Sequence, residues 1–285
     1  MSPVLTDVFA ALRETLGRQS LPDDAIGRIF LRLVRALAPV DEVVVFAYHD
    51  GERPLDLFST FTPAFYNIFV TLYQDGPYLL DPFCRNARDR RSGLFRMRDL
   101  APDRFYSSEY YRTYYVQTGL AEEVGYFVPV EDATIVLSLM RREASGSFSD
   151  GELAPLRQAE PLIGDIVRFY WGNVAMRFGS GKPTASPVQP WHRLNLTDRE
   201  AAIVELVLQG HSSESIALRL GIATGTVKVH RRNVYRKLGI SSQTQLLSLY
   251  LAERTPTEQA KLPVHETGSR PKLRIEANRS GFAGG

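Results

Sequence analysis

The sequence has little of the residues that build disulfides, secretory signals or membrane spans. Its one cysteine, Cys84, excludes an intramolecular disulfide and is typical of a protein from a reducing compartment. No apolar run approaches the roughly 20 residues that cross a bilayer. The first residues include Asp7 and Glu14 but no basic start, so we expect no secretory signal. These absences predict a cytoplasmic protein without a membrane partner.

Residue patterns typical of catalytic or metal-binding sites are also missing from the sequence. The five histidines show no metal-ligand spacing; they are His49, His192, His211, His230 and His265. The sequence contains neither a glycine-rich phosphate loop nor a nucleophile elbow. Its carboxylates are scattered as on an ordinary surface. We therefore expect no enzyme, no catalytic or metal site and no cofactor.

Lysine is absent before Lys182. A phosphoacceptor receiver domain needs a lysine to pair with its phosphate and an acidic pair after its first strand. The first predicted strand, residues 42–48, is followed by His49-Asp50-Gly51, which supplies no acidic pair. The first half of the chain is therefore not expected to be a receiver domain.

The length of 285 residues is enough for two domains, each with its own core. Residues 178–193 are rich in Gly, Ser and Pro, which is typical of a linker. This divides the chain into domains at 1–177 and 194–253. Residues 254–285 mix Pro, Gly and charge without apolar periodicity, and we predict a disordered tail.

Apolar periodicity in the first domain predicts helices, two strand pairs and a final long helix. The predicted helices are 2–17, 23–38, 63–74, 107–118 and 149–169, and the strands are 42–48, 55–61, 123–130 and 134–141, with 81–104 irregular. This order suits one mainly antiparallel sheet covered by helices. The expected fold class is α+β, with an N-terminal α-β-α sandwich joined to an all-α domain.

The second domain contains an unusually basic predicted helix, residues 226–238. A step of about 100° per residue places Val227, Val234 and Leu238 on one side. The opposite side is cationic and carries an amide; it comprises Lys228, Val229, Arg232, Asn233 and Arg236. Such a face suits the DNA major groove, because Arg and Lys reach phosphates or guanine, Asn reads adenine and an aliphatic stem meets a thymine methyl. The alternative is a solvated charged surface.

The segments around this helix favour the DNA-binding interpretation. Thr197-Asp198-Arg199-Glu200 has the form of a capping box, and Gly210 is placed to end the helix that it starts. Ser212 or Ser213 can begin a short second helix, and Gly221 lies in the turn before the basic one. Two helices joined by a tight glycine turn, with the second one basic, are typical of a helix-turn-helix.

Residues 194–253 resemble the C-terminal four-helix DNA-binding domain of the LuxR family. The resemblance rests on motifs in the family's order: Leu196-Thr197-Asp198-Arg199-Glu200, Gly210, Ile216-Ala217, Leu220-Gly221, Thr226-Val227-Lys228-Val229-His230 and Lys237-Leu238-Gly239. It implies that Lys228, Val229 and Arg232 face base edges. It also implies that Thr226, Arg231 and Lys237 lie near the DNA backbone. One departure is Ala223-Thr224-Gly225, where the family has a capping Ser; Thr224 is the expected substitute cap.

The first domain resembles GAF/PAS-like sensor domains and, more specifically, the autoinducer-binding domains of LuxR proteins. Phe65, Phe69 and Tyr73 stand at four-residue steps and Asp81-Pro82 follows, as in those domains. The resemblance implies a ligand site in which Asp81 accepts an amide hydrogen, Tyr73 lines the pocket and Ser138 faces it. Phe69 replaces the family's Trp and cannot donate its hydrogen bond, which disfavours acyl-homoserine lactones. The alternative is core packing followed by a turn.

Together these features predict a one-component DNA-binding transcriptional regulator. Its N-terminal domain would sense a small-molecule effector, and its helix-turn-helix would bind a two-fold operator in double-stranded DNA as a homodimer. RNA polymerase is a further expected partner. The alternative is a ligand-independent regulator whose N-terminal domain only dimerises or binds a protein.

Overall fold

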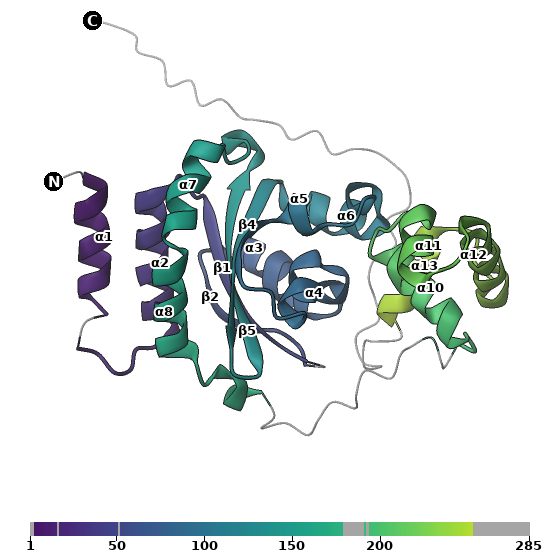
Figure 1. The fold of residues 1–285 in the computed structure, drawn as a ribbon, viewed down its shortest axis with the longest axis horizontal. Helices are drawn as coiled ribbons and strands as arrows, with labels where there is room; N and C mark the ends of the chain where they lie inside the picture. Colours follow the sequence, from purple (N-terminus) through teal and green to yellow (C-terminus); the bar gives the residue numbers. More distant parts are fainter. Residues whose placement is uncertain (1–2, 16, 51, 179–190, 192–193, 253–285) are drawn as a thin grey trace, which may run out of the picture.

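The computed structural model describes residues 3–15, 17–50, 52–178, 191 and 194–252. The predicted tail lies outside the described residues, and so does most of the predicted linker. A sheet between two helical layers forms the N-terminal domain, and four helices form the C-terminal domain beside it (Figure 1). Among the described residues, no helix is both long enough and apolar enough to cross a bilayer.

The strands of the described residues form one antiparallel sheet. They are β1 (Glu42–His49), β2 (Leu55–Ser59), β3 (Gly93–Arg96), β4 (Leu120–Val130) and β5 (Ala133–Arg142), in the order β2-β1-β5-β4-β3. β1, β4 and β5 are buried along most of their length because helices cover both faces of the sheet. The predicted α+β class, with an antiparallel sheet covered by helices, is confirmed.

One helical layer packs on the face of the sheet that lies away from the C-terminal domain (Figure 1). It consists of α2 (Asp23–Leu37), α7 (Asp150–Gln158) and α8 (Glu160–Trp171), and α1 (Pro3–Arg13) packs on the outer side of α2. Phe30 and Leu33 of α2 are fully buried, and Gly27 allows close approach, since a Cβ there would lie 2.0 Å from the ring of Phe58. The prediction of one long helix over 149–169 was wrong. The helical segment is interrupted at Ala159 because Pro161 lacks an N–H and fits the first turn of a new helix.

The other layer is built from short segments. They are α3 (Pro63–Tyr66), a π-helical continuation (Asn67–Leu72), α4 (Pro82–Arg88), α5 (Met97–Leu100) and α6 (Glu109–Thr113). The irregular prediction for 81–104 was wrong, because this stretch forms α4, β3 and α5. The prediction of one helix over 107–118 was also wrong. After α6 the chain turns at Tyr114, whose hydroxyl donates to the carbonyl of Ile68, and a 3-10 turn follows at Tyr115–Thr118.

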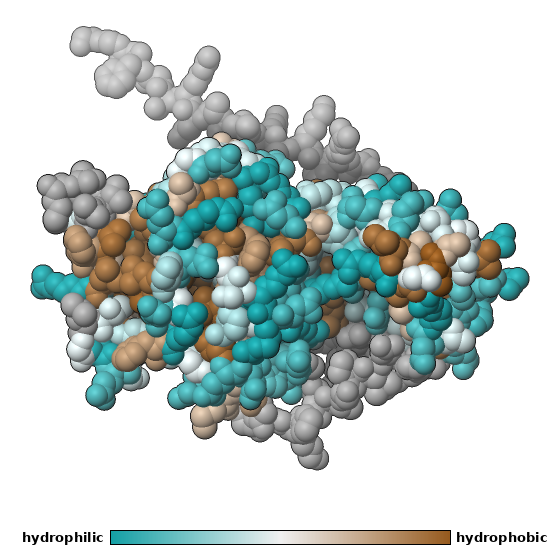
Figure 2. All heavy atoms as spheres, in the orientation of Figure 1, coloured by the Kyte–Doolittle hydropathy of each residue, from teal (hydrophilic) through white to brown (hydrophobic). Residues whose placement is uncertain are grey.

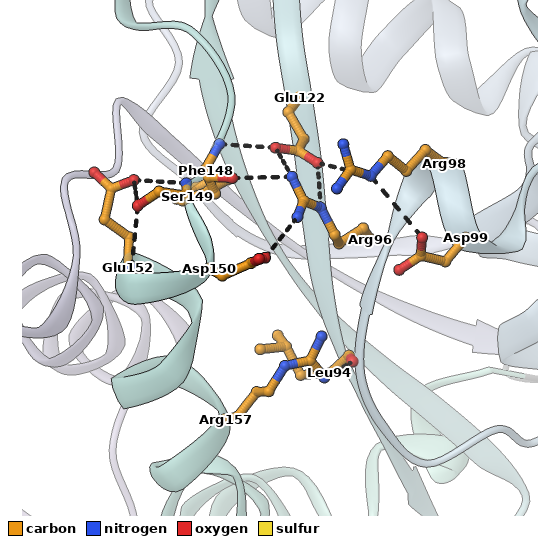
Figure 3. A network of polar contacts seen from close by, with 10 residues as sticks. All are labelled: Leu94, Arg96, Arg98, Asp99, Glu122, Phe148, Ser149, Asp150, Glu152 and Arg157. Carbon is orange, nitrogen blue, oxygen red and sulfur yellow. Dashed lines mark hydrogen bonds and ion pairs between the residues drawn. The ribbon is translucent and has the colours of Figure 1, made fainter.

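A buried ion pair explains why the short strand β3 is stable (Figure 3). The guanidinium of Arg96 in β3 donates two hydrogen bonds to the carboxylate of Glu122 in β4, and both side chains are almost fully buried. The loop before α7 completes the network, since the backbone N of Phe148 donates to Glu122 at 2.8 Å and its carbonyl accepts from Arg96 at 3.0 Å. A buried pair with its remaining hydrogen bonds satisfied avoids the penalty of an uncompensated charge.

The C-terminal domain consists of α10 (Asp198–Leu208), α11 (Ser213–Leu220), α12 (Thr224–Leu238) and α13 (Gln243–Ala252). The predicted capping box of Thr197 and Glu200 forms both of its hydrogen bonds. α12 begins after Ala223 without a side-chain cap, so the substitute cap expected from Thr224 was wrong. Gly221 ends α11 with φ +63°, a left-handed conformation that favours glycine, as the turn prediction required.

The two domains meet through the turn between α10 and α11. The backbone N of Arg104 donates to the carbonyl of Gly210 at 2.9 Å, and the backbone N of Ser212 donates to Oδ1 of Asp103 at 3.0 Å. Gly210 has φ +93°, and a Cβ at this position would lie 2.7 Å from the Cα of Phe105. The docking of the domains therefore requires glycine at position 210.

Candidate functional site

The predicted DNA-contacting residues all lie on α12, and most of them point into solvent. The exposed members are Thr226, Lys228, Val229, Arg232, Arg236 and Lys237, and the half-buried ones are Arg231 and Asn233. Val229 is 43% exposed, which is high for a large aliphatic side chain. The side chains of Lys228 and Arg232 form no hydrogen bond or ion pair with any other described residue. The face of α12 that was predicted to contact DNA is thus free for a partner.

The opposite face of α12 anchors the helix in the domain core. Val227 and Val234 are fully buried, seven residues apart, and Leu238 is half-buried. Seven residues are close to two helical turns, so these side chains line up toward α10 and α11. The predicted division of this helix into an apolar and a cationic side is confirmed by the burial of its residues.

Two of the cationic side chains fix α12 against its neighbours. Nζ of Lys237 lies 2.6 Å from Oε2 of Glu200 in α10, and Nη1 of Arg231 donates to Oγ of Ser213 in α11 at 3.4 Å. Burial alone would raise the pKa of Glu200, but hydrogen bonds from Lys237 and Thr197 lower it below the usual value. Glu200 therefore carries a charge that links the capping box of α10 to the end of α12.

The predicted ligand residues lie in the N-terminal domain around a cavity between the sheet and α6. Phe69, Tyr73, Asp81 and Ser138 line it, together with residues that include Val44, Tyr48, Tyr110, Tyr114, Tyr115, Glu123 and Met140. Its volume is about 30 Å³, which is room for one or two water molecules. Four of the five residues singled out in the sequence are thus brought together by the fold.

Phe65 is the exception, because it lies outside the lining of this cavity. The guanidinium of Arg142 covers its ring at 4.2 Å from the centroid. Its ring still contacts that of Phe69, with the two centroids 6.1 Å apart, although the helix changes to π-helical winding at Asn67. A four-residue spacing in the sequence could not show this change.

A chain of hydrogen bonds connects the tyrosines of the cavity to Asp81. The hydroxyl of Tyr73 lies 2.8 Å from that of Tyr48 and donates to Oδ2 of Asp81 at 2.6 Å. The other carboxylate oxygen of Asp81 accepts from the backbone N of Phe83 at 2.8 Å and caps α4. Asp81 therefore has a structural role as well as a place in the cavity.

Glu123 is a second buried carboxyl group in the same cavity, and it was not predicted from the sequence. In the sequence, Glu123 directly precedes the apolar run of β4, and an acidic residue in that position is typical of an exposed strand end. The hydroxyl of Tyr115 donates to Oε2 of Glu123 at 3.1 Å. Burial and the charge of Asp81 raise the pKa of Glu123 to about 8, and burial raises the pKa of Asp81 to about 6. Among the described residues that line the cavity, none is Lys, Arg or His.

These features do not form a metal or redox centre in the part of the chain that the structure describes. There, no group of three or more His, Cys, Asp or Glu side chains is arranged to hold a metal ion. Cys84 is buried near the cavity, and burial raises the pKa of its thiol to about 12, so the reactive thiolate is scarce at neutral pH. The chemistry of the cavity is therefore hydrogen bonding by carboxyl and phenol groups.

Comparison with known proteins finds similar sequences and similar solved structures. The family described as "Bacterial regulatory proteins, luxR family" matches residues 194–250. A putative HTH-type transcriptional regulator in the exeN 3'region of Aeromonas salmonicida is 35% identical over 154 residues, which are 50% of this chain and 79% of that protein. The nitrate/nitrite response regulator protein NarP of Escherichia coli (strain K12) is 31% identical over 132 residues, 46% of this chain and 50% of that protein.

Among solved structures, the VqsR LBD domain from Pseudomonas aeruginosa is similar to this chain with a TM-score of 0.50 and 27% identity. The match covers 59% of this chain and 96% of that domain. The family resemblance expected from residues 194–253 is thus confirmed. The chain belongs to the LuxR family of bacterial regulatory proteins and is a DNA-binding transcriptional regulator with an autoinducer-binding-like N-terminal domain.

Proposed function

We propose that this regulator senses a small molecule through the cavity of its N-terminal domain. The observation that carries the proposal is the pair of buried carboxyl groups, Asp81 and Glu123, on a cavity whose described lining residues include no cation. Burying a carboxyl group away from a counter-charge costs free energy, which a domain used only for dimerisation has no reason to incur. Titratable groups with strongly shifted pKa values gather at functional sites.

The residues of the cavity define the class of ligand. The carboxylate of Asp81 and the phenol oxygens accept hydrogen bonds, the carboxyl group of Glu123 accepts and, when protonated, also donates one, and Val44, Phe69 and Met140 offer apolar surface. A ligand that donates hydrogen bonds through an amine, amide or hydroxyl group and has an apolar body fits this lining. An anionic ligand does not, because it would meet Asp81 and Glu123 without a cation. The similarity to the VqsR domain named LBD supports a binding role for the fold.

Ligand entry requires the cavity to expand, since about 30 Å³ holds only water. The layer over the cavity suits such a change because it consists of short α-helical, π-helical and 3-10 segments. Short segments of this kind have few internal hydrogen bonds and open more easily than the sheet. A ligand would then act by preferring one arrangement of this layer over another.

A ligand-independent regulator is the second candidate. This candidate is favoured because the hydrogen bonds that join Tyr48, Tyr73 and Asp81 are complete without a ligand. A domain of this kind would use the cavity as ordinary core and bind only protein.

We also propose how α12 meets DNA. Lys228, Val229 and Arg232 would face base edges, because they are exposed and point away from the domain. The remaining predicted contacts would lie along the DNA backbone or at its edge; they are Thr226, Arg231, Asn233, Arg236 and Lys237. Arg231 and Lys237 support this division, since their contacts to Ser213 and Glu200 hold them at the sides of the helix.

We propose a homodimer formed through the helical layer that faces away from the C-terminal domain. Phe9 of α1 and Phe169 of α8 are 54% and 63% exposed, and Figure 2 shows apolar surface gathered over the first helices. The surface over α10–α13 is mostly hydrophilic in the same view. Exposed apolar patches of this kind mark protein interfaces, and a dimer would present two copies of α12 to a two-fold operator.

Mass spectrometry of small molecules released from protein purified from its native cells tests the sensing proposal. We expect a bound compound that donates hydrogen bonds, present at near-stoichiometric amounts in the wild type and depleted in Glu123→Gln. Glu143→Gln, an exposed acid outside the cavity, is the matched control. Absence of any such compound, together with DNA binding that is identical in Glu123→Gln, would favour the ligand-independent regulator.

A further inference from the structure

A second and much larger cavity lies between the two domains. Its volume is about 500 Å³. Arg104, Ser107 and Arg112 line it from the N-terminal domain, and Ser213, Lys228 and Arg231 line it from the C-terminal domain. We call it the interdomain cleft. It is distinct from the ligand cavity, which is lined by the N-terminal domain alone.

The interdomain cleft is strongly cationic. Its described lining holds four basic side chains, Arg104, Arg112, Lys228 and Arg231, against one acidic side chain, Glu214. His211 also lines it, but burial and nearby arginines lower its pKa to about 4, so it is neutral at pH 7. Arg112 lies 3.5 Å from the carboxylate of Glu109, and a contact of this length between partly exposed groups neutralises it only weakly. Cations grouped in a concave site attract anions.

The cleft is next to the face of α12 that we assign to DNA. Lys228 belongs to both, since its side chain is on the exposed side of α12 and also lines the cleft. The N-terminus of α11, beginning at Ser213, opens on the same space and adds the positive end of a helix dipole. A DNA strand lying along α12 would therefore bring a backbone phosphate to the mouth of the cleft.

We propose that the interdomain cleft binds a backbone phosphate of DNA, so that Arg104 and Arg112 of the N-terminal domain contribute to DNA binding alongside Lys228 and Arg231. The inference rests on DNA binding through α12. It adds that the N-terminal domain is itself part of the DNA-binding surface, when it is docked through Gly210 and Asp103.

The same short helix, α6, borders both cavities. Tyr110 faces the ligand cavity, while Arg112, two residues later, lines the interdomain cleft. A ligand that displaces α6 would move Arg112 and change the affinity of the cleft for phosphate. This placement gives a physical route from the ligand cavity to DNA affinity through a single five-residue helix.

The test is DNA binding by the full chain carrying Arg104→Ala, Arg112→Ala or both. The probe is a fluorescent duplex of random sequence, and affinity is measured by anisotropy over a range of salt concentrations. We expect each single variant to bind roughly 3- to 10-fold more weakly, and the slope of log affinity against log salt to fall by about one for each charge removed. Arg112→Lys, which keeps the charge, should retain most of the affinity.

Arg53→Ala is the matched control. Arg53 is an exposed arginine paired with an acid, Asp75, as Arg112 is with Glu109, but it lies just before β2, outside the interdomain cleft and outside the helical layer proposed for the dimer. Its removal should leave DNA affinity unchanged. Thermal melting of all variants checks folding, which we expect to be intact because Arg104 and Arg112 are exposed.

Three results would be informative in different ways. If Lys228→Ala weakens binding but Arg104→Ala and Arg112→Ala do not, or if these two bind more tightly, the shared cleft is overturned while DNA binding by α12 stands. If Lys228→Ala and Arg232→Ala are also without effect, the DNA face itself is wrong. If inorganic pyrophosphate binds the wild type but not Arg112→Ala, and DNA affinity is equal in both, the cleft binds a free anion and the DNA assignment is overturned.

Discussion

The hydroxyl of Tyr73 donates a hydrogen bond of 2.6 Å to Asp81, eight residues later, and so connects the π-helical segment to the first turn of α4. Because Asp81 also accepts from the backbone N of Phe83, both of its oxygens are engaged within the protein. A ligand that binds Asp81 must share or replace the bond from Tyr73. Ligand binding and the position of α4 are therefore physically connected.

Substitution of Asp81 separates its structural role from its binding role. Asp81→Asn keeps a side-chain oxygen that can cap α4, whereas Asp81→Ala removes the cap. We expect Asp81→Ala to be less stable than Asp81→Asn by about 1 kcal/mol, the usual contribution of an N-cap. Urea unfolding measures this difference. Equal stability of the two variants would show that the bond to Phe83 contributes nothing.

Glu123 should make the stability of the protein depend on pH. Its pKa is raised from 4.5 to about 8 in the folded state, so the folded protein holds a proton that the unfolded chain releases. This contribution is fully present below pH 4.5 and is lost as the pH rises through 8. The raised pKa of Asp81 acts in the same direction as that of Glu123, but only between pH 3.8 and 6. The lowered pKa of His211 acts in the opposite direction, and only between pH 4 and 6.5.

The interval from pH 6.5 to 8 therefore isolates Glu123 from these two groups. We expect the wild type to lose on the order of 1 kcal/mol of stability across it. Glu123→Gln, which cannot titrate, should have a flat profile there, and Glu143→Gln should behave as the wild type. Urea midpoints measured at half-unit pH steps give the slopes. A wild type and Glu123→Gln with parallel profiles would contradict the buried, protonated state of Glu123.

Arg232 and Lys228 should each contribute to DNA affinity through their charge. Alanine at either position removes a cation that is exposed on α12. We expect a drop in affinity of about 5- to 20-fold and a flatter salt dependence, because fewer counterions are released from the DNA. A gel-shift titration with Arg53→Ala as control measures the effect. Unchanged binding in both variants would mean that another face of the domain contacts DNA.

Gly210 should be less tolerant of alanine than other glycines with positive φ. Its φ is +93°, and a Cβ would lie 2.7 Å from the Cα of Phe105 in the other domain. Gly239 has φ +65° and nothing within 4 Å of the same position, so Gly239→Ala measures backbone strain alone. We expect Gly239→Ala to lower the free energy of unfolding by about 1 kcal/mol. Gly210→Ala should lower it further and should also loosen the contact between the domains.

Unfolding in urea and hydrogen exchange at residues 102–105 measure these two effects. Increased exchange there in Gly210→Ala, with normal exchange in Gly239→Ala, is the expected result. If the two variants are equally stable and exchange alike, close packing at Gly210 does not hold the domains together.

Local sequence was enough for the elements whose pattern is set by their own residues. The capping pair of Thr197 and Glu200, the glycine at 221 and the two faces of α12 were all predicted, because caps, left-handed turns and helical periodicity act over a few residues. The strands of the two hairpins were found for the same reason, from their apolar and β-branched runs.

Where a segment depends on distant partners, the sequence pattern failed. β3 exists because Arg96 meets Glu122 and pairs its backbone with β4, and nothing within residues 81–104 indicates this. The turn after α6 and the π-helical segment after Tyr66 are likewise joined by a distant contact, since the hydroxyl of Tyr114 donates to the carbonyl of Ile68. Intrinsic propensity is too weak to decide such short segments, so tertiary contacts decide them.

The sequence by itself determined that this chain carries a DNA-binding helix-turn-helix of the LuxR family behind an α+β domain, since local periodicity, caps and motif spacing suffice for both. Only the tertiary structure placed Glu123 beside Asp81, and only it brought Arg112 of one domain to Lys228 of the other. The physical reason is that a cavity or a cleft is defined by side chains far apart in the chain. Their proximity depends on how whole layers and domains pack.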